Sequence, residues 1–411
     1  MKRLIAVMLA LALLLTACAQ GNADDLMQNV PAKAVDVLPD MDSGAAAAAD
    51  FGVRLFQASV EEGKNTLISP LSVLYALAMT ANGADGNTLA QMEQVLGMET
   101  EELNSFMRAY LDLLPESKVY KLSLANSIWF KDDPRFQVEQ SFLQTNADYY
   151  GADAYKAAFD EATRNDINNW VKEHTDGMIP EILDEIPEDA VMYLVNALAF
   201  DAEWQEIYEA HQVWEGEFCL EDGTPRTVDL MHSEENRYLE DELATGFIKY
   251  YKDKQYAFAA LLPNEGVTVQ EYVDSLTGEH LMKLLSNPEK VTVFATMPKF
   301  ETEYSVEMSE ALMEMGMTDA FDYRISDFSR LGTYDADGLN ICINRVLHKT
   351  FISVSEKGTR AGAATAVEMA AEGALLIEDY KTVTLDRPFV YMLIDCQTNL
   401  PFFIGTMMDV G

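Results

Sequence analysis

The hydrophobic pattern of the 411-residue chain changes along its length. In the first third, apolar residues occur at helical spacing or in runs that follow helix-start signals. Ser69 and Pro70 supply a cap and a first turn for a buried helix over 71–79, which ends at Asn82. A second helix is predicted over 86–96, before Gly97. An amphipathic stretch further on predicts another helical segment, at residues 167–172.

Strand signals dominate later in the chain, where apolar runs rich in β-branched and aromatic residues are separated by turn residues. Helices early and strands late favour an α+β class over a regular βαβ alternation. No Pro- or Ser-rich linker divides the chain, and a hydrophobic fraction of 49% is ample for one large core. The predicted strands span residues 191–200, 256–262, 291–297, 341–355 and 389–395.

Residues 356–369 form a stretch of small residues with two-residue alternation. Read as a strand, the stretch puts every second side chain on one face. That face is small or apolar, and the charges Arg360 and Glu368 lie on the opposite face. A flexible linker would use Gly and Ser, whereas a helix is disfavoured by several Gly, Thr and Val residues. The pattern fits a loop that can enter a sheet, with its buried face made by Thr359, Ala361, Ala363, Thr365, Val367 and Met369.

This stretch resembles the reactive-loop hinge of serpins, a family of suicide inhibitors of proteases. Further motifs of the family occur in register from about residue 50 to the C-terminus. They are Asn65–Val73, Ile167–Val171 with Thr175–Gly177, Leu194–Ala197 with Phe200 and Trp204, Leu261–Pro263, Met297–Phe300, Asp327–Ser329, His348–Lys349, Arg387–Phe389 and Leu400–Phe402.

The resemblance implies a serpin fold of the α+β class with three β-sheets, about eight or nine helices and an exposed reactive-centre loop. The serpin domain would span 46–411, with the loop at about 356–386. It implies a hinge made of Glu356, Gly358, Thr359, Ala361, Gly362, Ala363, Ala364 and Thr365. It also implies a polar cluster under the central sheet and an aromatic residue where loop insertion begins, formed by Ser69 or Ser72 with Asn196 and His348, and by Trp204.

The mechanism implied is irreversible inhibition of a serine protease. The protease would cleave the loop, form an acyl-enzyme and be trapped as the loop inserts into the central sheet. In the family, the residue before the cut bond lies about sixteen positions after the hinge glutamate. Counted from Glu356, this resemblance implies a cut between Glu372 and Gly373, which suits a glutamate-cleaving enzyme. The segment that follows is longer than is typical of the family, so other bonds remain open. Met369, Ala370 or Ala371 would suit an elastase-like protease, and Leu375 or Leu376 a chymotrypsin-like or papain-like one.

The N-terminus has the pattern of a secretory signal. Two basic residues precede a short apolar run over 4–15, which is too short for a confident membrane span. The sequence then reaches Cys18 through small residues, as in a bacterial lipobox, which predicts cleavage after residue 17 and a lipid on Cys18. Residues 18–45 would be a flexible tether, and the protein would be an extracellular lipoprotein on the bacterial cell surface.

The net charge and the cysteine spacing exclude several classes of binding partner. The formal net charge is 29 − 68 = −39, which opposes binding to nucleic acid. Residues 99–104, where many serpins carry a basic heparin-binding helix, are acidic, so we expect no heparin cofactor. The remaining cysteines (Cys219, Cys342 and Cys396) have no metal-ligand spacing and are expected to be free, mostly buried thiols. We expect a monomer without a cofactor whose partner is a secreted protease.

No enzyme signature survives inspection of the chain. It lacks a G-x-S-x-G elbow, a paired zinc-ligand motif, a P-loop and a dinucleotide fingerprint. Residues 334–338 faintly resemble the start of a calcium loop but read better as a turn. The remaining alternatives are a cross-class inhibitor of papain-like proteases and a non-inhibitory serpin that binds or carries a ligand.

Overall fold

The computed structural model describes residues 23–114, 119–187, 190–335, 338–359 and 379–411. These residues form nine α-helices, two short 3-10 helices and four sheets. The α-helices are α2 (Met41–Ser59), α3 (Pro70–Ala81), α4 (Gly86–Leu96), α5 (Thr100–Leu113), α6 (Gln140–Tyr150), α7 (Glu161–His174), α8 (Val269–Ser275), α9 (Gly278–Ser286) and α10 (Ser309–Glu314). The 3-10 helices are η1 (Ala210–Gln212) and η2 (Asp319–Phe321).

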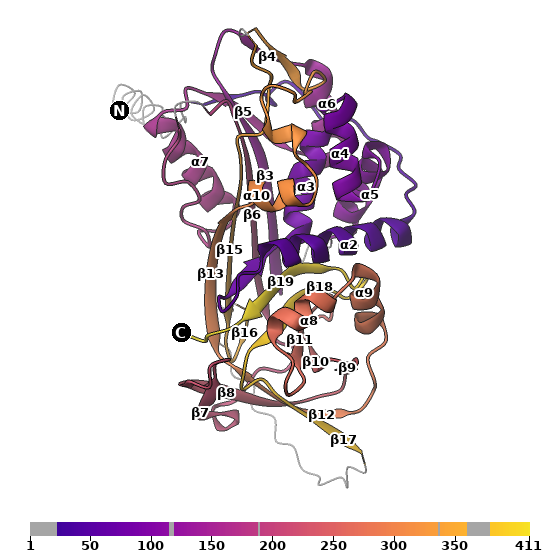
Figure 1. The fold of residues 1–411 in the computed structure, drawn as a ribbon, viewed down its shortest axis with the longest axis vertical. Helices are drawn as coiled ribbons and strands as arrows, with labels where there is room; N and C mark the ends of the chain where they lie inside the picture. Colours follow the sequence, from indigo (N-terminus) through magenta and orange to yellow (C-terminus); the bar gives the residue numbers. More distant parts are fainter. Residues whose placement is uncertain (1–22, 115–118, 188–189, 336–337, 360–378) are drawn as a thin grey trace, which may run out of the picture.

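The largest sheet, called sheet A here, runs along the length of the molecule (Figure 1). Its long strands β3 and β6 pair antiparallel from Tyr120 opposite Ala202 to Phe130 opposite Met192. The sequence pattern did not reveal β3, whose middle carries the polar pair Asn126 and Ser127. In order, sheet A consists of β1 (Asp24–Asp25), β5 (Asp153–Ala157), β3 (Tyr120–Lys131), β6 (Met192–Glu203), β16 (Gly358–Thr359), β15 (Arg345–Val354) and β13 (Phe300–Glu307).

Two further sheets and a ribbon complete the fold. Sheet B has the order β2 (Thr66–Ile68), β19 (Pro401–Met407), β18 (Phe389–Asp395), β11 (Tyr256–Pro263), β10 (Ala244–Tyr250) and β9 (Tyr238–Glu240). Sheet C has the order β17 (Tyr380–Thr384), β12 (Thr292–Pro298), β8 (Pro225–Glu235) and β7 (Val213–Cys219). A two-stranded ribbon pairs β14 (Gly332–Tyr334) with β4 (Phe136–Val138). The three expected sheets are therefore present, and the ribbon is an addition.

Both faces of sheet A are covered, as the alternation of β6 requires. Tyr193, Val195 and Ala197 belong to a cluster with Trp170 and Val171 of α7. The intervening residues of β6, among them Leu194 and Leu198, face the main core instead. Helix α3, whose twelve residues are all buried, lies within that core. The expected helix start is observed, because the Ser69 side chain caps α3 by accepting from the Ser72 N–H.

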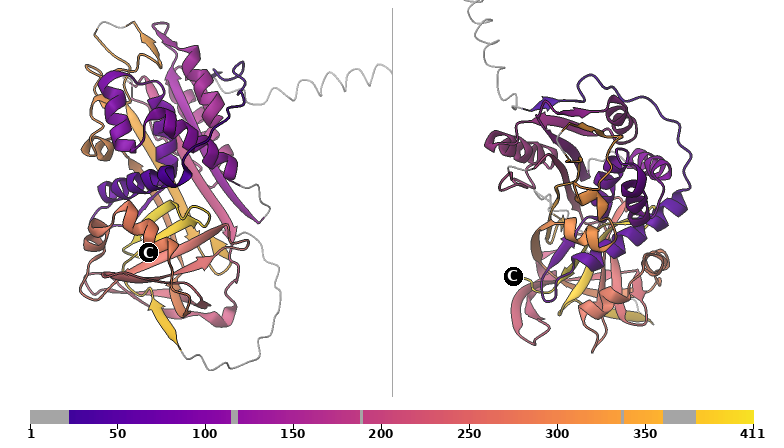
Figure 2. Two further views of the ribbon diagram at one scale, coloured as in Figure 1. Left: turned by 90° about the vertical axis from the view of Figure 1, so that its right-hand side faces the viewer. Right: turned by 45° about the horizontal axis from the view of Figure 1, so that its top comes forward.

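The N-terminal segment differs from the flexible tether expected for residues 18–45, of which 18–22 lie outside the described residues. Strand β1 pairs with β5 at the edge of sheet A, and Val30 is buried. The Lys33 N–H donates to Asp148 of α6 at 2.7 Å. From there the segment runs around the outside of the helices (Figure 2), and α2 already begins at Met41.

The predicted strand at residues 341–355 begins later than expected. Ile341 and Ile343 are buried but precede β15, and the Ile343 N–H donates to Ala320 instead of entering a ladder. These residues are apolar because they pack in the core and not because they belong to a strand. Hydrophobicity alone therefore predicted a strand that is too long. Among the cysteines, Cys342 is buried, but Cys219 is exposed, contrary to expectation.

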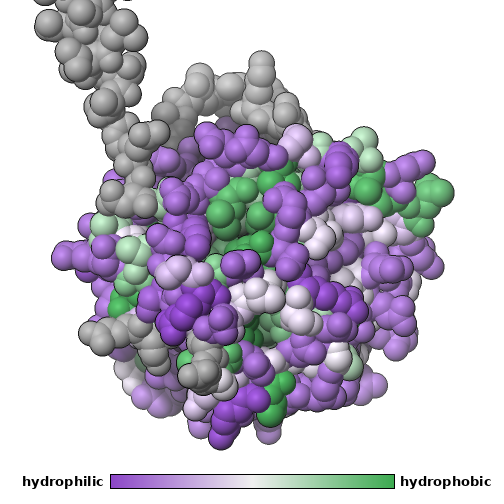
Figure 3. All heavy atoms as spheres, turned by 90° about the horizontal axis from the view of Figure 1, so that it is seen from above, coloured by the Kyte–Doolittle hydropathy of each residue, from purple (hydrophilic) through white to green (hydrophobic). Residues whose placement is uncertain are grey.

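Much of the surface is hydrophilic. Seen from above, the end of the molecule around β4 and α6 is mostly hydrophilic (Figure 3). Among the helices that the structure describes, none has the length and apolar character needed to cross a bilayer. The described residues also contain no group of three or more His, Cys, Asp or Glu side chains placed to hold a metal ion.

Candidate functional site: the seam between strands β6 and β15

Strands β6 and β15 pair over only part of their length. They run parallel with paired residues from Tyr193 opposite Arg345 to Leu198 opposite Thr350; we call this part the closed half of the seam. Beyond it the strands part and admit β16, which pairs antiparallel with both neighbours; we call this part the hinge half. The first residues of the predicted hinge therefore already lie between the two strands.

Gly358 and Thr359 fit this narrow position for different reasons. A Cβ atom on Gly358 would lie 2.0 Å from the carbonyl oxygen of Ala202, and its φ of +157° also disfavours other residues. Thr359 is 1% exposed and its hydroxyl hydrogen-bonds the Tyr251 hydroxyl under the sheet. Thr359 thus lies on the inward face, the face that the alternation of the sequence assigned to it.

The turn before β16 is fastened at several points. The Ser355 N–H donates to the Gly358 carbonyl at 3.0 Å, and the Tyr208 N–H donates to the Glu356 carbonyl at 2.8 Å. The Glu356 carboxylate accepts from Lys299 Nζ at 2.9 Å. Partial burial opposes ionisation of Glu356, but the hydrogen bond from Lys299, a backbone hydrogen bond and the positive charges of Lys299 and Lys357 together leave the pKa of Glu356 below its ordinary value.

Trp204 closes the same end of the sheet. Its indole N–H donates to the Ser355 carbonyl at 2.9 Å, and its ring stacks on Tyr251 at 4.4 Å between centroids. The Lys249 ammonium lies 5.5 Å from the Trp204 ring centre and pairs with Glu235 at 2.8 Å. Both charges of this pair are largely buried, so each satisfies the other beneath the aromatic layer.

A polar cluster lies under the closed half. Asn196 Oδ1 accepts from the Ser72 hydroxyl at 2.6 Å and contacts His348 Nδ1 at 3.1 Å. The Asn196 amide group donates to the Ser72 carbonyl and to Asn126. The amide of Asn196 therefore has the four partners it can take, all in the core. Asn126 was not predicted as a member; it reaches the cluster from β3, the strand that the sequence pattern missed.

His348 is neutral in this environment. Its Nε2 accepts the Ser69 N–H at 3.0 Å, so its proton is on Nδ1 and is donated to Asn196. Burial lowers the pKa of His348 to about 3, because the charged imidazolium would lose its hydration. The Ser69 side chain serves as the cap of α3, and only its backbone contacts His348.

Several predicted site residues lie outside the described residues. They are the rest of the hinge (Ala361, Gly362, Ala363, Ala364 and Thr365), the candidate reactive bonds (Met369, Ala370, Ala371, Glu372, Gly373, Leu375 and Leu376) and Cys18.

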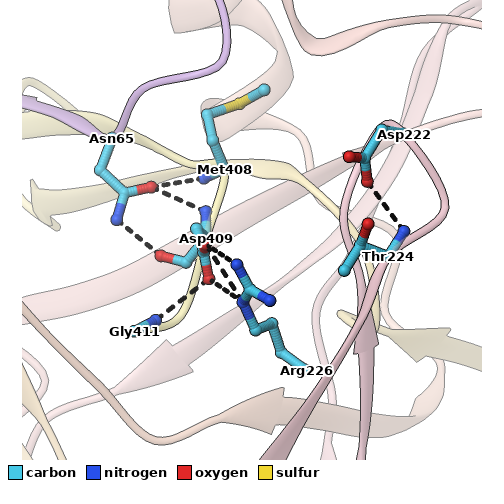
Figure 4. Close-up of polar contacts among 7 residues, drawn as sticks. All are labelled: Asn65, Asp222, Thr224, Arg226, Met408, Asp409 and Gly411. Carbon is cyan, nitrogen blue, oxygen red and sulfur yellow. Dashed lines mark hydrogen bonds and ion pairs between the residues drawn. The ribbon is translucent and has the colours of Figure 1, made fainter.

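The structure also gives a role to a motif residue that the sequence left unexplained. Asn65 binds the C-terminal segment, since its Oδ1 accepts the N–H groups of Met408 and Asp409 and its amide donates to the Asp409 carbonyl (Figure 4). Arg226 at the start of β8 pairs with the Asp409 carboxylate at 3.0 Å. The last residues of the chain are thus fastened to both sheet B and sheet C.

Comparison with known proteins yields one family. A family model described as serpin (serine protease inhibitor) matches residues 46–410. Serpin B6 of Macaca fascicularis is 30% identical over 383 residues, covering 89% of this chain and 99% of that protein. An uncharacterised serpin-like protein of Thermococcus kodakarensis is 29% identical over 400 residues, covering 95% of this chain and 91% of that protein.

Among solved structures, the thermophilic serpin tengpin in its native state is 48% identical with a TM-score of 0.90, covering 94% of this chain and 100% of that one. Tengpin in its latent state gives a TM-score of 0.80 at the same identity, covering 92% of this chain and 100% of that one. The structure is therefore more similar to the native arrangement of tengpin than to the latent one.

Proposed function

Because the chain belongs to the serpin family, we propose that it is an irreversible inhibitor of a secreted serine protease. The observation that carries the proposal is the position of Gly358 and Thr359 between β6 and β15. A strand that has begun to form there can lengthen once the loop is cut. By the alternation of the sequence, residues up to Val367 would then place only small or apolar side chains on the inward face. The inhibitor would act as a monomer and be consumed in the reaction.

Similarity to two states of tengpin supports a protein with more than one arrangement of the same fold. The native and latent structures of that serpin are both 48% identical in sequence to this chain, but their TM-scores differ, at 0.90 and 0.80. Insertion of a cleaved loop releases energy stored in the native state, a recognised type of conformational switch. The target would be an elastase-like or glutamate-specific enzyme, as the candidate bonds at 369–376 suggest.

A protease panel tests the proposal directly. The protein would be mixed with pancreatic elastase, subtilisin, glutamyl endopeptidase and papain, and analysed by denaturing gels and intact mass. We expect a covalent complex with at least one serine protease and a released C-terminal peptide whose mass locates the bond. Each protease inactivated beforehand at its nucleophile is the control and should give no complex. Cleavage without any complex would favour a non-inhibitory serpin, and a complex with papain alone a cross-class inhibitor.

We also propose that the protein is anchored to the outside of a bacterial cell by a lipid on Cys18. Supporting this, the described chain begins beside β5, at the end of the molecule remote from sheet C and β16 (Figure 1). An anchor there would hold the hinge end away from the membrane. Cys18→Ser should move the protein from the detergent-rich fraction to the soluble one. A wild-type protein found wholly in the soluble fraction would contradict the anchor.

A further inference from the structure

The outer face of sheet C carries three exposed aromatic side chains. Trp214 of β7, Phe294 of β12 and Tyr380 of β17 are 52%, 39% and 57% exposed. Their rings are organised by neighbours on the same face: Phe294 meets Tyr380 edge-on at 5.4 Å, and Trp214 stacks on His232 at 3.5 Å. We call Trp214, His232, Phe294 and Tyr380 the aromatic face.

The alternation of β12 shows that this face is the solvent side of the sheet. Val293, Ala295 and Met297 point inward and are nearly inaccessible, whereas Phe294 points outward between them. The outward face of a half-buried sheet is ordinarily polar, as Thr382, the partner of Phe294 in register, illustrates. Aromatic side chains grouped on such a face are typical of interaction sites.

A shallow hollow of about 350 Å³ opens between these side chains, lined by Trp214, His232, Phe294 and Thr296 among others. Within it, His232 Nδ1 hydrogen-bonds the Thr296 hydroxyl at 2.9 Å. The other ring nitrogen, Nε2, is buried and has no hydrogen-bond partner within the described parts of the chain. A buried polar atom without a partner is costly, so a bound partner would gain by hydrogen-bonding Nε2 where docking also uncovers that atom.

The charge of the aromatic face bears on the kind of partner it would bind. The chain carries a net charge of −39, and exposed Glu234 lines the hollow, because it lies opposite Phe294 in the pairing of β8 with β12. Exposed Glu209 lies just before η1, whose His211 and Gln212 also line the hollow. An aromatic surface that includes acidic side chains suits a partner with an apolar protrusion and basic residues beside it.

The position of the aromatic face in the chain indicates which partner reaches it. Tyr380 comes eight residues after Glu372 and eleven after Met369. At about 3.6 Å per residue these segments span at most about 29 and 40 Å. A protease domain of about 230 residues has a diameter of roughly 45 Å. A protease holding any of the candidate bonds is therefore large enough to reach sheet C.

We propose that the aromatic face is a second docking surface for the target protease, which speeds recognition beyond what the loop sequence provides. This inference rests on the proposed inhibitory function. The surface would raise the rate at which protease and loop meet productively, and it would leave the later insertion step unchanged, because it lies outside the seam between β6 and β15.

The test compares Trp214→Ala and Phe294→Ala with Tyr323→Ala, which removes an equally exposed aromatic ring (48% exposed) outside sheet C. Second-order rate constants of inhibition and the number of inhibitor molecules used per protease would be measured for every protease of the panel that forms a covalent complex. We expect about a tenfold slower association for the two sheet C variants with at least one protease, as for a central interface residue. The stoichiometry should not change, and Tyr323→Ala should behave as the wild type.

Unchanged rate constants for both sheet C variants with every complex-forming protease would overturn the docking surface while leaving the inhibitory function intact. If the wild type forms no covalent complex, the inhibitory function fails and the docking surface falls with it. Sedimentation of the wild type at rising concentration provides a separate check. Self-association that Trp214→Ala abolishes would assign the aromatic face to a second copy of this chain and overturn the inference.

Discussion

In the closed half of the seam, β6 and β15 are joined by six parallel residue pairs, whereas in the hinge half the same strands are separated by the two residues of β16. The closed half covers the His348 and Asn196 cluster, in which the hydrogen bonds of the Asn196 amide are complete. The hinge half is lined by aromatic rings and already holds part of the loop. Opening the closed half must break satisfied buried hydrogen bonds, but the hinge half only has to lengthen a strand.

The register of β16 indicates how the two halves would meet. Thr359 lies opposite Ala202 of β6 and Val354 of β15. If the strand continued in the same antiparallel register, residue 365 would lie opposite both Asn196 and His348. Since the inward face repeats every second residue, Thr365 would share the inward face of Thr359. We therefore expect the loop to bring a hydroxyl group to the polar cluster that it displaces.

Cleavage of the loop should change the stability of the protein most. The cut loop could then insert between β6 and β15 along the closed half as well as the hinge half. About a dozen residues would gain ladder hydrogen bonds worth about 1 kcal/mol each, in addition to apolar burial. This sum is comparable to the stability of a whole domain, so the melting temperature should rise by tens of degrees. The measurement is a melting scan before and after limited proteolysis at 369–376. Melting of the cleaved protein at or below the intact protein would show that the strand does not lengthen.

Thr359→Arg should block the hinge half at its first step. Thr359 is buried against Tyr251, and an unpaired charge there would cost several kcal/mol. We expect the loop to be cut as a substrate while the protease leaves active, as read by denaturing gels and residual protease activity. Thr359→Ser keeps the hydroxyl and is the matched control. Undiminished complex formation by Thr359→Arg would remove the hinge from the mechanism.

Thr365→Arg should stop insertion of the loop at the boundary between the hinge half and the closed half. By the register above, insertion would proceed through the hinge half and stop at the His348 cluster. Cleavage should then raise the melting temperature by less than in the wild type and by more than in Thr359→Arg. Thr365→Ser is the control. Equal stabilisation of Thr365→Arg and the wild type would show that the inserted strand follows another register.

His348→Ala should weaken the closed half by about 2–4 kcal/mol. It leaves a cavity and removes the hydrogen-bond partner of the Ser69 N–H and of Asn196. We expect heat-induced insertion or polymer formation at lower temperature, followed on native gels after mild heating. His211→Ala, at an exposed histidine outside the seam, is the control. If both variants inserted the loop or formed polymers at the same temperature, the cluster would have no part in keeping β6 and β15 together.

Lowering the pH should reduce the free energy of unfolding by a smaller amount, through the protonation of His348. The pKa of His348 is about 3 in the folded protein and about 6.5 in an unfolded chain, so the unfolded state binds the extra proton between these values. Stability is therefore complete above pH 6.5 and falls as the pH decreases, by at most about 1.4 kcal/mol per pH unit. Denaturant unfolding at pH 7 and 5 should show this loss in the wild type. His348→Gln should lack this part of the pH dependence, and equal slopes would contradict the assignment.

The seam residues that the sequence predicted are those that belong to local sequence patterns. The hinge alternation predicted Thr359, the family resemblance added Gly358 and Glu356, and the cap before α3 predicted Ser69. Tyr251, which binds Thr359, follows β10, and Lys299, which binds Glu356, lies between β12 and β13. Asn126, which binds Asn196, lies in β3, and only the tertiary structure brings these residues together. Their roles depend on contacts between residues far apart in the sequence, which no local pattern records.

The N-terminal segment shows a different limit of sequence reasoning. Asp24 and Asp25 have low strand propensity, yet they form β1 because the edge of β5 offers unpaired backbone groups. Val30 is buried, and Leu26 and Met27 pack partly buried against the core. The position of the segment after Cys18 suggested a tether, but the backbone hydrogen bonds available at a sheet edge do not depend on the side chains that pass it.

The place of the C-terminal strands in sheet B has a consequence for the synthesis of the protein. Strand β19 lies between β2 and β18, and β18 lies between β19 and β11. The middle of this sheet is thus completed by residues 389–407, which are made long after β2 and β11. Until then, β2 and β11 lack their neighbours and the buried faces around them remain open. A nascent chain therefore cannot complete this sheet before residues 389–407 have been made, and it depends on protection from aggregation until those strands arrive.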